Sequence, residues 1–265
     1  PWTAAPIATA AEIMTYLGEV IDENELGQHI RYSHTITEAS WSSNDAMWTL
    51  DVTRTDTGEQ LRFTANFLWM CQGYYRHSEG YTPEWEGMER FGGRIVHPQT
   101  WPEDLDYADK NVVVIGSGAT AATLIPAMAD RCEHITMLQR SPTYFVTGRN
   151  ANEMVETLRE LDIDETWIHE IARRKILQDQ ELFMQLSATD PEFVRQELFA
   201  GIREYLGEDY DIEQHFAPSY RPWQQRVAFV PDGDLFQGIA DGKASVVTDQ
   251  IVRFNETGIE LASGE

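Results

Sequence analysis

Apolar residues recur at two different spacings in the first part of this chain. Over residues 8–20 they recur at helical spacing, which predicts one helix. Residues 29–36 and 47–52 alternate between apolar and polar positions, and residues 61–71 form a longer segment that is apolar towards its end. These patterns predict three strands. The turn sequence at residues 56–59 predicts a hairpin between the second and third strands. The first part of the chain is therefore predicted to be a helix followed by a strand meander.

A second set of elements follows an irregular segment. Residues 75–109 are rich in glycine, proline and aromatic residues, and they are expected to form an ordered linker. The β-branched run at residues 111–115 predicts a strand that is buried on both faces. A helix at residues 120–130 and an apolar strand at residues 134–138 are predicted next. Pro126 removes a helical hydrogen bond at a cost of roughly 3 kcal/mol, so a kinked or shortened helix is expected.

Helical spacing dominates residues 151–213, which contain 17 acidic and 6 basic residues. This region is predicted to be an all-helical excursion with solvated acidic faces, and its basic cluster at residues 173–175 is expected on a helix surface. The proline-containing segment 218–222 ends the helices. Further strands are predicted at residues 227–230, 244–248 and 251–254.

The strand, turn, helix and strand between residues 111 and 138 form one βαβ unit of the Rossmann type, so the predicted fold class is α/β. Its turn has the pattern G-x-G-x-x-A, in Gly116-Ser117-Gly118-Ala119-Thr120-Ala121. The first glycine allows a tight turn, the second lets a pyrophosphate approach the backbone, and the small alanine lets the helix pack on the strand. The free N–H groups at the helix start and the Thr120 hydroxyl would then donate to the anion. The alternative is a glycine turn without a ligand.

The end of the second strand indicates which dinucleotide is bound. NAD-binding folds usually place an acid about 20 residues after the glycines, where it holds the ribose 2′-hydroxyl. This chain has Gln139-Arg140-Ser141 there. Arg140 would pair with a 2′-phosphate and Ser141 could donate to it, which favours NADPH over NADH. The alternative is that Arg140 is a solvated charge at a strand end.

Composition narrows the classes of partner. The chain has 265 residues and a net charge of −24, from 20 basic and 44 acidic residues, which argues against nucleic acid or an anionic membrane surface. No apolar run approaches the roughly 18 residues of a membrane span. The start, Pro1-Trp2-Thr3, has no signal-peptide pattern and is expected to be cut from a longer chain. Cys71 and Cys132 are expected to be free thiols in the cytoplasm. No metal site is expected, and the sequence carries no signal for an oligomeric state.

The linker contains a longer motif. Residues 91–102 spell F-x-G-x-x-x-H-x-x-x-W-P, in Phe91-Gly92-Gly93-Arg94-Ile95-Val96-His97-Pro98-Gln99-Thr100-Trp101-Pro102. This motif resembles the fingerprint of Baeyer–Villiger monooxygenases, the ketone-oxidising branch of the flavin-containing monooxygenases. Pro83 and Gly87 also match that pattern, as do the glycine turn and the segment at Arg140. The resemblance is strong over residues 62–146 and moderate over residues 218–248.

The resemblance implies an NADPH-binding domain inserted into an FAD-binding domain. Residues 1–72 and 227–265 would belong to the FAD-binding domain, and residues 73–226 would be the NADPH-binding domain with its linker and helical insertion. NADPH would reduce FAD, O₂ would form a C4a-peroxyflavin, and that species would attack a small-molecule ketone. The alternatives are oxygenation of sulfur or nitrogen by a flavin monooxygenase, and a silent NADP-binding module. Trp101-Pro102 favours the ketone branch.

The resemblance also implies roles for two residues and an incomplete cofactor site. Arg226 matches the catalytic arginine of the family, where it would stabilise developing negative charge; the alternative is an ordinary salt bridge. His97 matches the fingerprint histidine, which would couple the linker to domain motion or anchor it locally. Gln225 stands where the family usually has a lysine for the NADPH phosphate. The first glycine signature, an upstream acid and a later A-T-G-F segment are absent, so the chain as given is expected neither to hold FAD nor to turn over.

Overall fold

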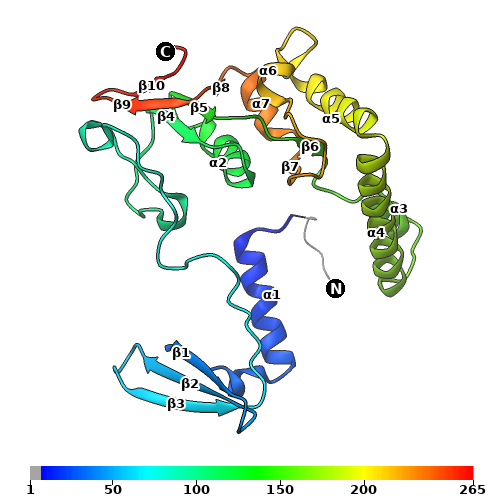
Figure 1. Cartoon of the computed structure of the whole chain (residues 1–265). Coiled ribbons are helices and arrows are strands. Elements are labelled where there is room, and N and C mark those ends of the chain that lie inside the picture. Colours follow the sequence, from blue (N-terminus) through cyan, green and yellow to red (C-terminus); the bar gives the residue numbers. More distant parts are fainter. Residues whose placement is uncertain (1–6, 265) are drawn as a thin grey trace. The chain divides into compact units, whose positions relative to one another are not determined.

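The computed structural model describes residues 7–264, which fall into two compact units (Figure 1). Residues 8–78 form the smaller unit, and the larger unit contains residues 79–264 together with Ile7. The first six residues of the expected 1–72 segment, including Pro1-Trp2-Thr3, lie outside the described residues, as does Glu265. The two units are described separately.

The smaller unit is a helix followed by an antiparallel meander. Helix α1 (Ala10–Glu23) begins at Thr9, whose side chain accepts from the N–H of Glu12 while the Glu12 carboxylate accepts from Thr9. This reciprocal pair satisfies N–H groups that the helix start leaves free. After a 3₁₀ turn at Leu26–His29, the sheet has the order β1-β2-β3. Its strands are β1 (His34–Ser42), β2 (Met47–Arg54) and β3 (Gln60–Ala65).

The predicted helix, the second strand and the hairpin at Gly58 are confirmed, but the outer strands are displaced. The first strand was expected at residues 29–36 and begins at His34, because Ser33 adopts a left-handed backbone with φ of 57°. The third was expected to reach residue 71 and ends at Ala65, which pairs with Trp48. Strand β2 begins only one residue before Trp48, so residues 66–71 have no β2 residues left to pair with.

The smaller unit buries little apolar surface of its own. Val52 is its one buried apolar side chain among the described residues. The side chains of Phe67 and Trp69 are 76% and 79% exposed, and Met14 and Leu17 of α1 are exposed as well. A sheet and a helix need to bury an apolar face to be stable, and this unit does not do so within residues 8–78.

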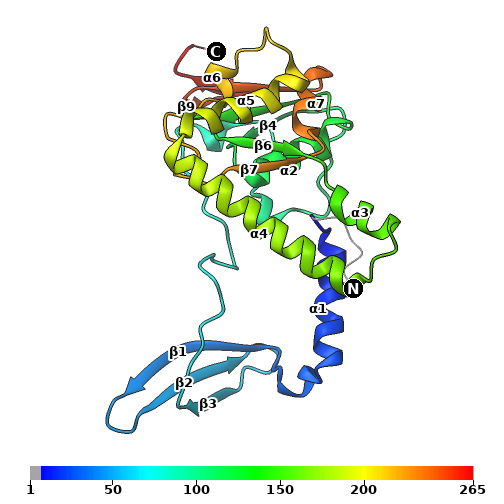
Figure 2. The same ribbon diagram turned by 90° about the vertical axis from the view of Figure 1, so that its right-hand side faces the viewer.

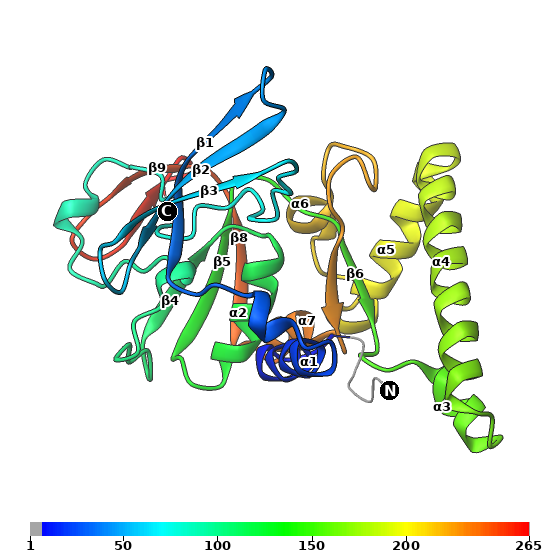
Figure 3. The same cartoon turned by 90° about the horizontal axis from the view of Figure 1, so that it is seen from below.

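The larger unit contains the predicted βαβ motif in a parallel sheet of order β4-β5-β8 (Figures 1 and 3). Ile115 pairs with Leu138, and Gln139 pairs with Thr248, so the carboxyl ends of all three strands meet at one edge. Helix α2 follows β4, and helix α7 precedes β8. The elements are β4 (Asn111–Ile115), α2 (Ala119–Ala129), β5 (His134–Gln139), α7 (Asp234–Ala240) and β8 (Ala244–Thr248).

Strand β4 differs from the prediction that both of its faces are buried. Its side chains alternate, and Val113 and Ile115 are 46% and 44% exposed. Val112 and Val114 pack against the core on one face, and the core cluster of the described residues contains no side chain of the opposite face. The expected shortening of α2 is also absent, because the helix continues past Pro126 to Ala129.

The helical region predicted at residues 151–213 is confirmed, and its helices span residues 153–216 apart from short connections (Figure 2). The helices are α3 (Glu153–Glu160), α4 (Glu165–Thr189), α5 (Pro191–Leu206) and α6 (Ile212–Phe216). The basic cluster at residues 173–175 lies on the surface of α4, where Arg174 pairs with Glu170 and Lys175 with Asp179.

Strand β6 (Phe145–Gly148), helix α7 and strand β10 (Ile259–Leu261) were not predicted. β6 pairs in parallel with β7 (Ala228–Pro231), and β10 pairs with β9 (Ile251–Phe254). Each missed element is short, and β6 is stabilised by a partner more than 80 residues later in the chain. Strands β7, β8 and β9 lie where they were predicted.

An aromatic cluster joins the last helix of the helical region, α6, to strand β6 and helix α7. Phe145 of β6, Phe216 of α6 and Phe236 of α7 are each 0% exposed. Their ring centroids lie 5.3 to 5.9 Å apart in edge-on arrangements. Such contacts add roughly 0.5–1.5 kcal/mol each to the burial of the rings. The excursion is therefore part of the same core as the βαβ unit.

The cofactor domains expected at residues 1–72, 73–226 and 227–265 remain a prediction. The compact units divide near residue 78, and β8 pairs with β5 in the sheet that carries the glycine turn. Cys71 and Cys132 are free. Within residues 7–264, no helix combines the length and apolar character that crossing a bilayer requires.

Candidate functional site

The candidate site is built on the carboxyl edge of the sheet, where the glycine turn and the Arg140 segment lie on neighbouring strands. The turn follows Ile115 of β4, and Arg140 follows Gln139 of β5. The Gly116 N–H donates to the Leu138 carbonyl at 2.8 Å, which continues the ladder between the two strands into the turn. The structure thus brings together the two halves of the predicted dinucleotide site.

The two glycines of the turn are needed for different reasons. Gly116 has φ of 121°, a backbone conformation that side chains rarely allow. Gly118 has φ of −77° and ψ of −177°, which any residue can adopt. A Cβ added at Gly118 would meet no atom of the described residues within 4 Å, apart from its two neighbours in the chain. Neither backbone strain nor protein packing requires glycine at position 118, so the open space there is suited to a ligand that approaches the backbone.

The start of α2 supplies donors beside that space. Gly118 caps the helix without a side chain, and Ala119 and Thr120 are exposed. The first N–H groups of a helix have no partner within it and carry partial positive charge. Ala121 is only 4% exposed, in agreement with its predicted packing role. This donor set fits a pyrophosphate.

Ser117 contributes to the turn in a different way. Its side chain is only 8% exposed, and its hydroxyl lies 2.8 Å from the Thr143 hydroxyl. This hydrogen bond ties the glycine turn to the segment that follows Arg140 and Ser141. We therefore expect Ser117 to meet a ligand through its backbone N–H, since its hydroxyl already has a protein partner.

Arg140 and Ser141 are exposed at the end of β5. Within residues 7–264, neither side chain has a hydrogen bond or ion pair, so both can meet an anion. The residue before them is different, because Gln139 is 1% exposed and donates to the His215 carbonyl at 2.6 Å and to the Thr248 hydroxyl at 2.9 Å. These partners were not predicted from the sequence, because only the tertiary fold brings α6 and β8 to Gln139.

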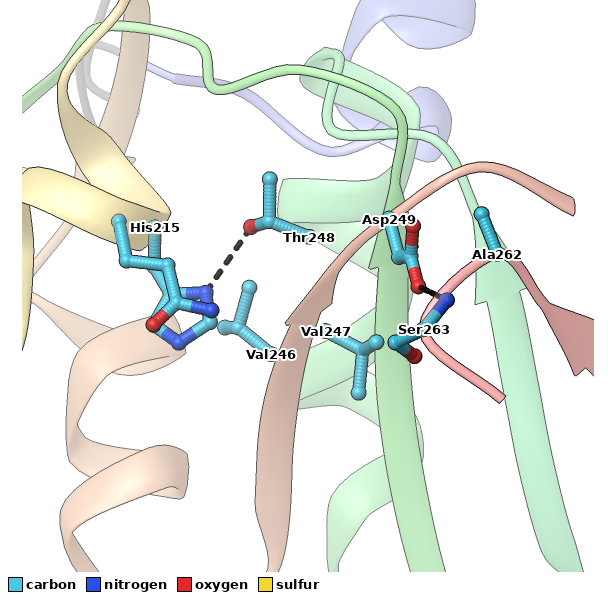
Figure 4. Close-up of a pocket in the computed structure, with 8 residues that line it drawn as sticks. His215, Val246, Val247, Thr248, Asp249, Ala262 and Ser263 are labelled. Atoms are coloured by element: carbon cyan, nitrogen blue, oxygen red, sulfur yellow. Dashed lines mark hydrogen bonds between the residues drawn. The ribbon is translucent and has the colours of Figure 1, made fainter. Parts of the chain in front are cut away.

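A hollow of about 840 Å³ lies beside these partners at the carboxyl end of β8 (Figure 4). His215 hydrogen-bonds Thr248 at 2.9 Å on one side, and Asp249 accepts from the Ser263 N–H at 2.9 Å on the other. The hollow is lined by Gln214, His215, Val246, Val247, Thr248, Asp249, Ala262 and Ser263. None of the residues predicted to bind the cofactor lines it.

His97 anchors the linker locally. Its Nδ1 accepts from the Gln99 N–H at 3.1 Å, which caps the 3₁₀ turn Pro98–Thr100. A Cβ on Gly80 would collide with the His97 ring, so the imidazole lies directly on the Gly80 backbone. These contacts agree with the local-anchor alternative, and the coupling of His97 to domain motion remains a prediction.

Other residues of the fingerprint hold the linker against strand β9. The Phe91 ring meets Phe254 edge-on at 5.9 Å, and the Gly92 N–H donates to the Glu256 carbonyl at 2.9 Å. Gly87 has φ of 83°, and a Cβ there would collide with the Phe254 carbonyl. The glycines of the motif therefore allow the two backbones to come close together.

Arg226 follows a strained turn. Trp223 has φ of 60°, which is unusual for a bulky residue, and its ring meets Phe183 of α4 edge-on at 6.1 Å. Arg226 itself is exposed and forms no ion pair with any residue in the range 7–264. The salt-bridge alternative therefore has no partner in the described part of the chain.

We expect Gly118→Val to abolish dinucleotide binding while the unfolding transition stays close to that of the wild type. The extended backbone accepts valine, but its side chain would fill the space that a pyrophosphate needs. Calorimetric titration with NADPH and thermal unfolding measure the two effects. Gly258→Val, at a glycine in the β9–β10 connection with similarly open space, is the control. Normal NADPH binding by Gly118→Val would show that the turn is purely structural.

We also expect His215 to make the fold sensitive to acid. Burial holds the pKa of its imidazole below the ordinary value of 6.5, although nearby Asp211 acts in the opposite direction. The unfolded chain therefore binds a proton more readily than the folded one, and the free energy of unfolding should fall as the pH drops below about 6.5. His215→Gln should flatten this dependence in urea titrations between pH 7.5 and 5.5. An identical slope in the variant would rule out His215 as the source.

Comparison with known proteins agrees with this geometry. Residues 7–157, more than half of the chain, match the family described as flavin-binding monooxygenase-like. The chain is 44% identical to the FAD-containing monooxygenase EthA of Mycolicibacterium smegmatis and 42% identical to the putative FAD-containing monooxygenase MymA of Mycobacterium tuberculosis. All of this chain aligns in both cases, and it spans 54% of each relative, about half their length.

Solved structures show the same fold at lower sequence identity. An oxidized steroid monooxygenase bound to NADP has a TM-score of 0.72 and 23% identity, covering 99% of this chain and 55% of that one. The complex of OTEMO with FAD and NADP has a TM-score of 0.69 and 19% identity, covering 99% and 56%. The sequence motif, the βαβ geometry and the family match agree. The chain belongs to the flavin-binding monooxygenase-like family.

Proposed function

We propose that the full-length protein is an FAD- and NADPH-dependent monooxygenase that inserts one oxygen atom of O₂ into a small-molecule ketone. The observation that carries the nucleotide part is the open backbone at Gly118 near Arg140, which has no ion pair within residues 7–264; the two positions follow adjacent strands at one sheet edge. The oxygenation part is supported by membership of the family and by the fingerprint at residues 91–102.

The preference for NADPH rests on charge at the end of β5. Arg140 and Ser141 offer a guanidinium and a hydroxyl, both exposed, at the position where an acid would select NADH. A guanidinium binds phosphate through two parallel hydrogen bonds, and a carboxylate would repel it. Gln225 adds no charge, so Arg140 carries this preference without a lysine before Arg226.

FAD is proposed because the relatives EthA and MymA are named as FAD-containing and OTEMO was solved with FAD and NADP. Bound flavin would supply the oxygen-activating chemistry, while the protein would orient the substrates and exclude water. The segments proposed to contribute to the FAD-binding domain are residues 1–72 and 227–265. The protein is proposed to act in the cytoplasm.

Arg226 is proposed to stabilise negative charge that develops during oxygen transfer. It is exposed after the turn at Trp223, and no carboxylate among residues 7–264 neutralises it. A preorganised cation lowers the cost of forming charge in the transition state. The turn before it is fastened by packing on α4, which would limit the reorganisation of Arg226 during the reaction.

Oxygenation of sulfur or nitrogen is the second candidate reaction. The motif ends in Trp101-Pro102, which favours the ketone branch, and Trp101 packs edge-on against Tyr107 at 6.1 Å. Product analysis of the full-length protein with a ketone panel and a thioether panel separates the two reactions. Ester or lactone products support the ketone reaction, whereas sulfoxide without ester reverses the order. Absence of any NADPH oxidation would leave a silent NADP-binding module.

Arg140→Ala should weaken NADPH far more than NADH. A charge-assisted hydrogen bond contributes roughly 1.5–3 kcal/mol, so NADPH should lose at least about tenfold in affinity. Calorimetric titrations with both nucleotides measure the difference. Arg174→Ala, which removes an exposed arginine of α4, controls for the change in net charge. Equal losses for both nucleotides would contradict contact with the 2′-phosphate.

Arg226→Ala in the full-length enzyme should retain nucleotide binding but lose about 10²–10³ in the rate of oxygenation, because one stabilising donor is gone. Arg226→Lys should recover only part of the rate, since a point charge lacks the planar fork of arginine. The assay is oxygenated product per NADPH consumed, with hydrogen peroxide measured in parallel. If Arg226→Ala formed as much oxygenated product per NADPH consumed as the wild type, the proposed role of Arg226 in oxygenation would be wrong.

A further inference from the structure

Gln139 is the most buried polar side chain at the candidate site. The roles proposed for Arg140 and Ser141 do not explain why the residue before them is a buried glutamine. Its side chain is 1% exposed at the last position of β5. The amide nitrogen donates to the His215 carbonyl at 2.6 Å and to the Thr248 hydroxyl at 2.9 Å. Both donor hydrogens of the amide are therefore in use, on two different elements.

These contacts close into a ring. The His215 imidazole hydrogen-bonds the Thr248 hydroxyl at 2.9 Å (Figure 4). The Asp249 N–H also donates to the main-chain carbonyl of Gln139 at 2.9 Å. Thr248 ends β8, and His215 lies on α6, whose residue Phe216 is fully buried. The ring thus joins the ends of two strands to a helix anchored in the aromatic core.

The orientation of the Gln139 amide follows from its partners. The His215 carbonyl can only accept a hydrogen bond, so the amide nitrogen and not the oxygen must face it. The amide oxygen is buried and has no partner within residues 7–264. A buried acceptor without a partner lowers the free energy of unfolding, so the Gln139 side chain stabilises the fold less than its two donated bonds suggest. We therefore ask which neighbouring residues Gln139 holds in place.

Arg140 and Ser141 leave the sheet directly after this ring. Both are exposed and have no side-chain partner within residues 7–264, so their own side chains do not fix their placement. Bidentate binding of a phosphate by arginine depends on geometry as well as charge. We propose that Gln139 is a positioning residue, which holds the end of β5 through His215 and Thr248 so that Arg140 and Ser141 discriminate for a 2′-phosphorylated nucleotide. This inference rests on the NADPH site proposed above.

The test measures the affinity of the full-length protein for NADP⁺ and for NAD⁺ by calorimetric titration, under conditions without turnover. Gln139→Met keeps a similar volume and removes both donors. It should weaken NADP⁺ about tenfold and change NAD⁺ binding less than about twofold. Thr248→Val should act in the same direction. The double variant should lose no more than the stronger single variant, because both substitutions break one ring.

A matched control comes from the same pair of strands. The Thr136 hydroxyl of β5 lies 3.2 Å from the Ser245 hydroxyl of β8, three residues before Gln139 and Thr248 along each strand. Thr136→Val removes a comparable contact between β5 and β8 away from the carboxyl edge. It should leave the ratio of NADP⁺ to NAD⁺ affinity unchanged. Thermal unfolding of every variant shows whether a loss of binding reflects loss of the fold.

The outcomes separate the inference from the proposed function. If the wild type prefers NADP⁺ and Arg140→Ala removes that preference, an unchanged affinity ratio in folded Gln139→Met overturns the positioning role alone. Additive losses in the double variant, or an equal change of the ratio in Thr136→Val, overturn it as well. A wild type that binds NAD⁺ as tightly as NADP⁺ overturns both the cofactor preference and the role of Gln139.

Discussion

Parallel pairing of β4, β5 and β8 is the constraint on which the candidate site depends. In a parallel sheet the carboxyl ends of neighbouring strands share one edge, and ligands of open α/β sheets bind there. The glycine turn and Arg140 are about 20 residues apart in the chain, yet the pairing of Ile115 with Leu138 places them on adjacent strands. A dinucleotide long enough to contact both could therefore use the backbone at one and the charge at the other.

The edge is supported by contacts that come from distant parts of the chain. The aromatic cluster of Phe145, Phe216 and Phe236 packs α6 and α7 against β6 in the core shared with the sheet, and the His215 carbonyl of α6 accepts a hydrogen bond from Gln139. The hydrogen bond between the Ser117 and Thr143 hydroxyls connects the glycine turn to the segment that precedes β6. The helical excursion is thus a structural support of the site as well as an acidic surface.

The strongly negative net charge of this protein disfavours binding of an anionic nucleotide, so the site needs local positive charge. A net charge of −24 repels an anionic nucleotide at long range. Many of the arginines are paired with carboxylates, for example Arg149 with Glu153 and Arg159 with Glu165. Arg140 and Arg226 make no such pair within residues 7–264, so each keeps its charge available where an anion is proposed to bind or to form.

The sequence alone determined the βαβ unit, the glycine turn, the Arg140 segment and most helices, because these depend on local periodicity and on backbone requirements such as that of Gly116. It also indicated the family through a long motif at residues 91–102. The tertiary structure decided what depends on partners far along the chain. Strand β3 ends at Ala65 because β2 has no further residues to pair with it. One face of β4 stays exposed, and β6 forms by pairing with the distant strand β7. Gln139 is buried against His215 and Thr248, which lie 76 and 109 positions away in the chain. A local sequence pattern does not indicate such distant hydrogen-bond partners, so only the tertiary structure could identify them.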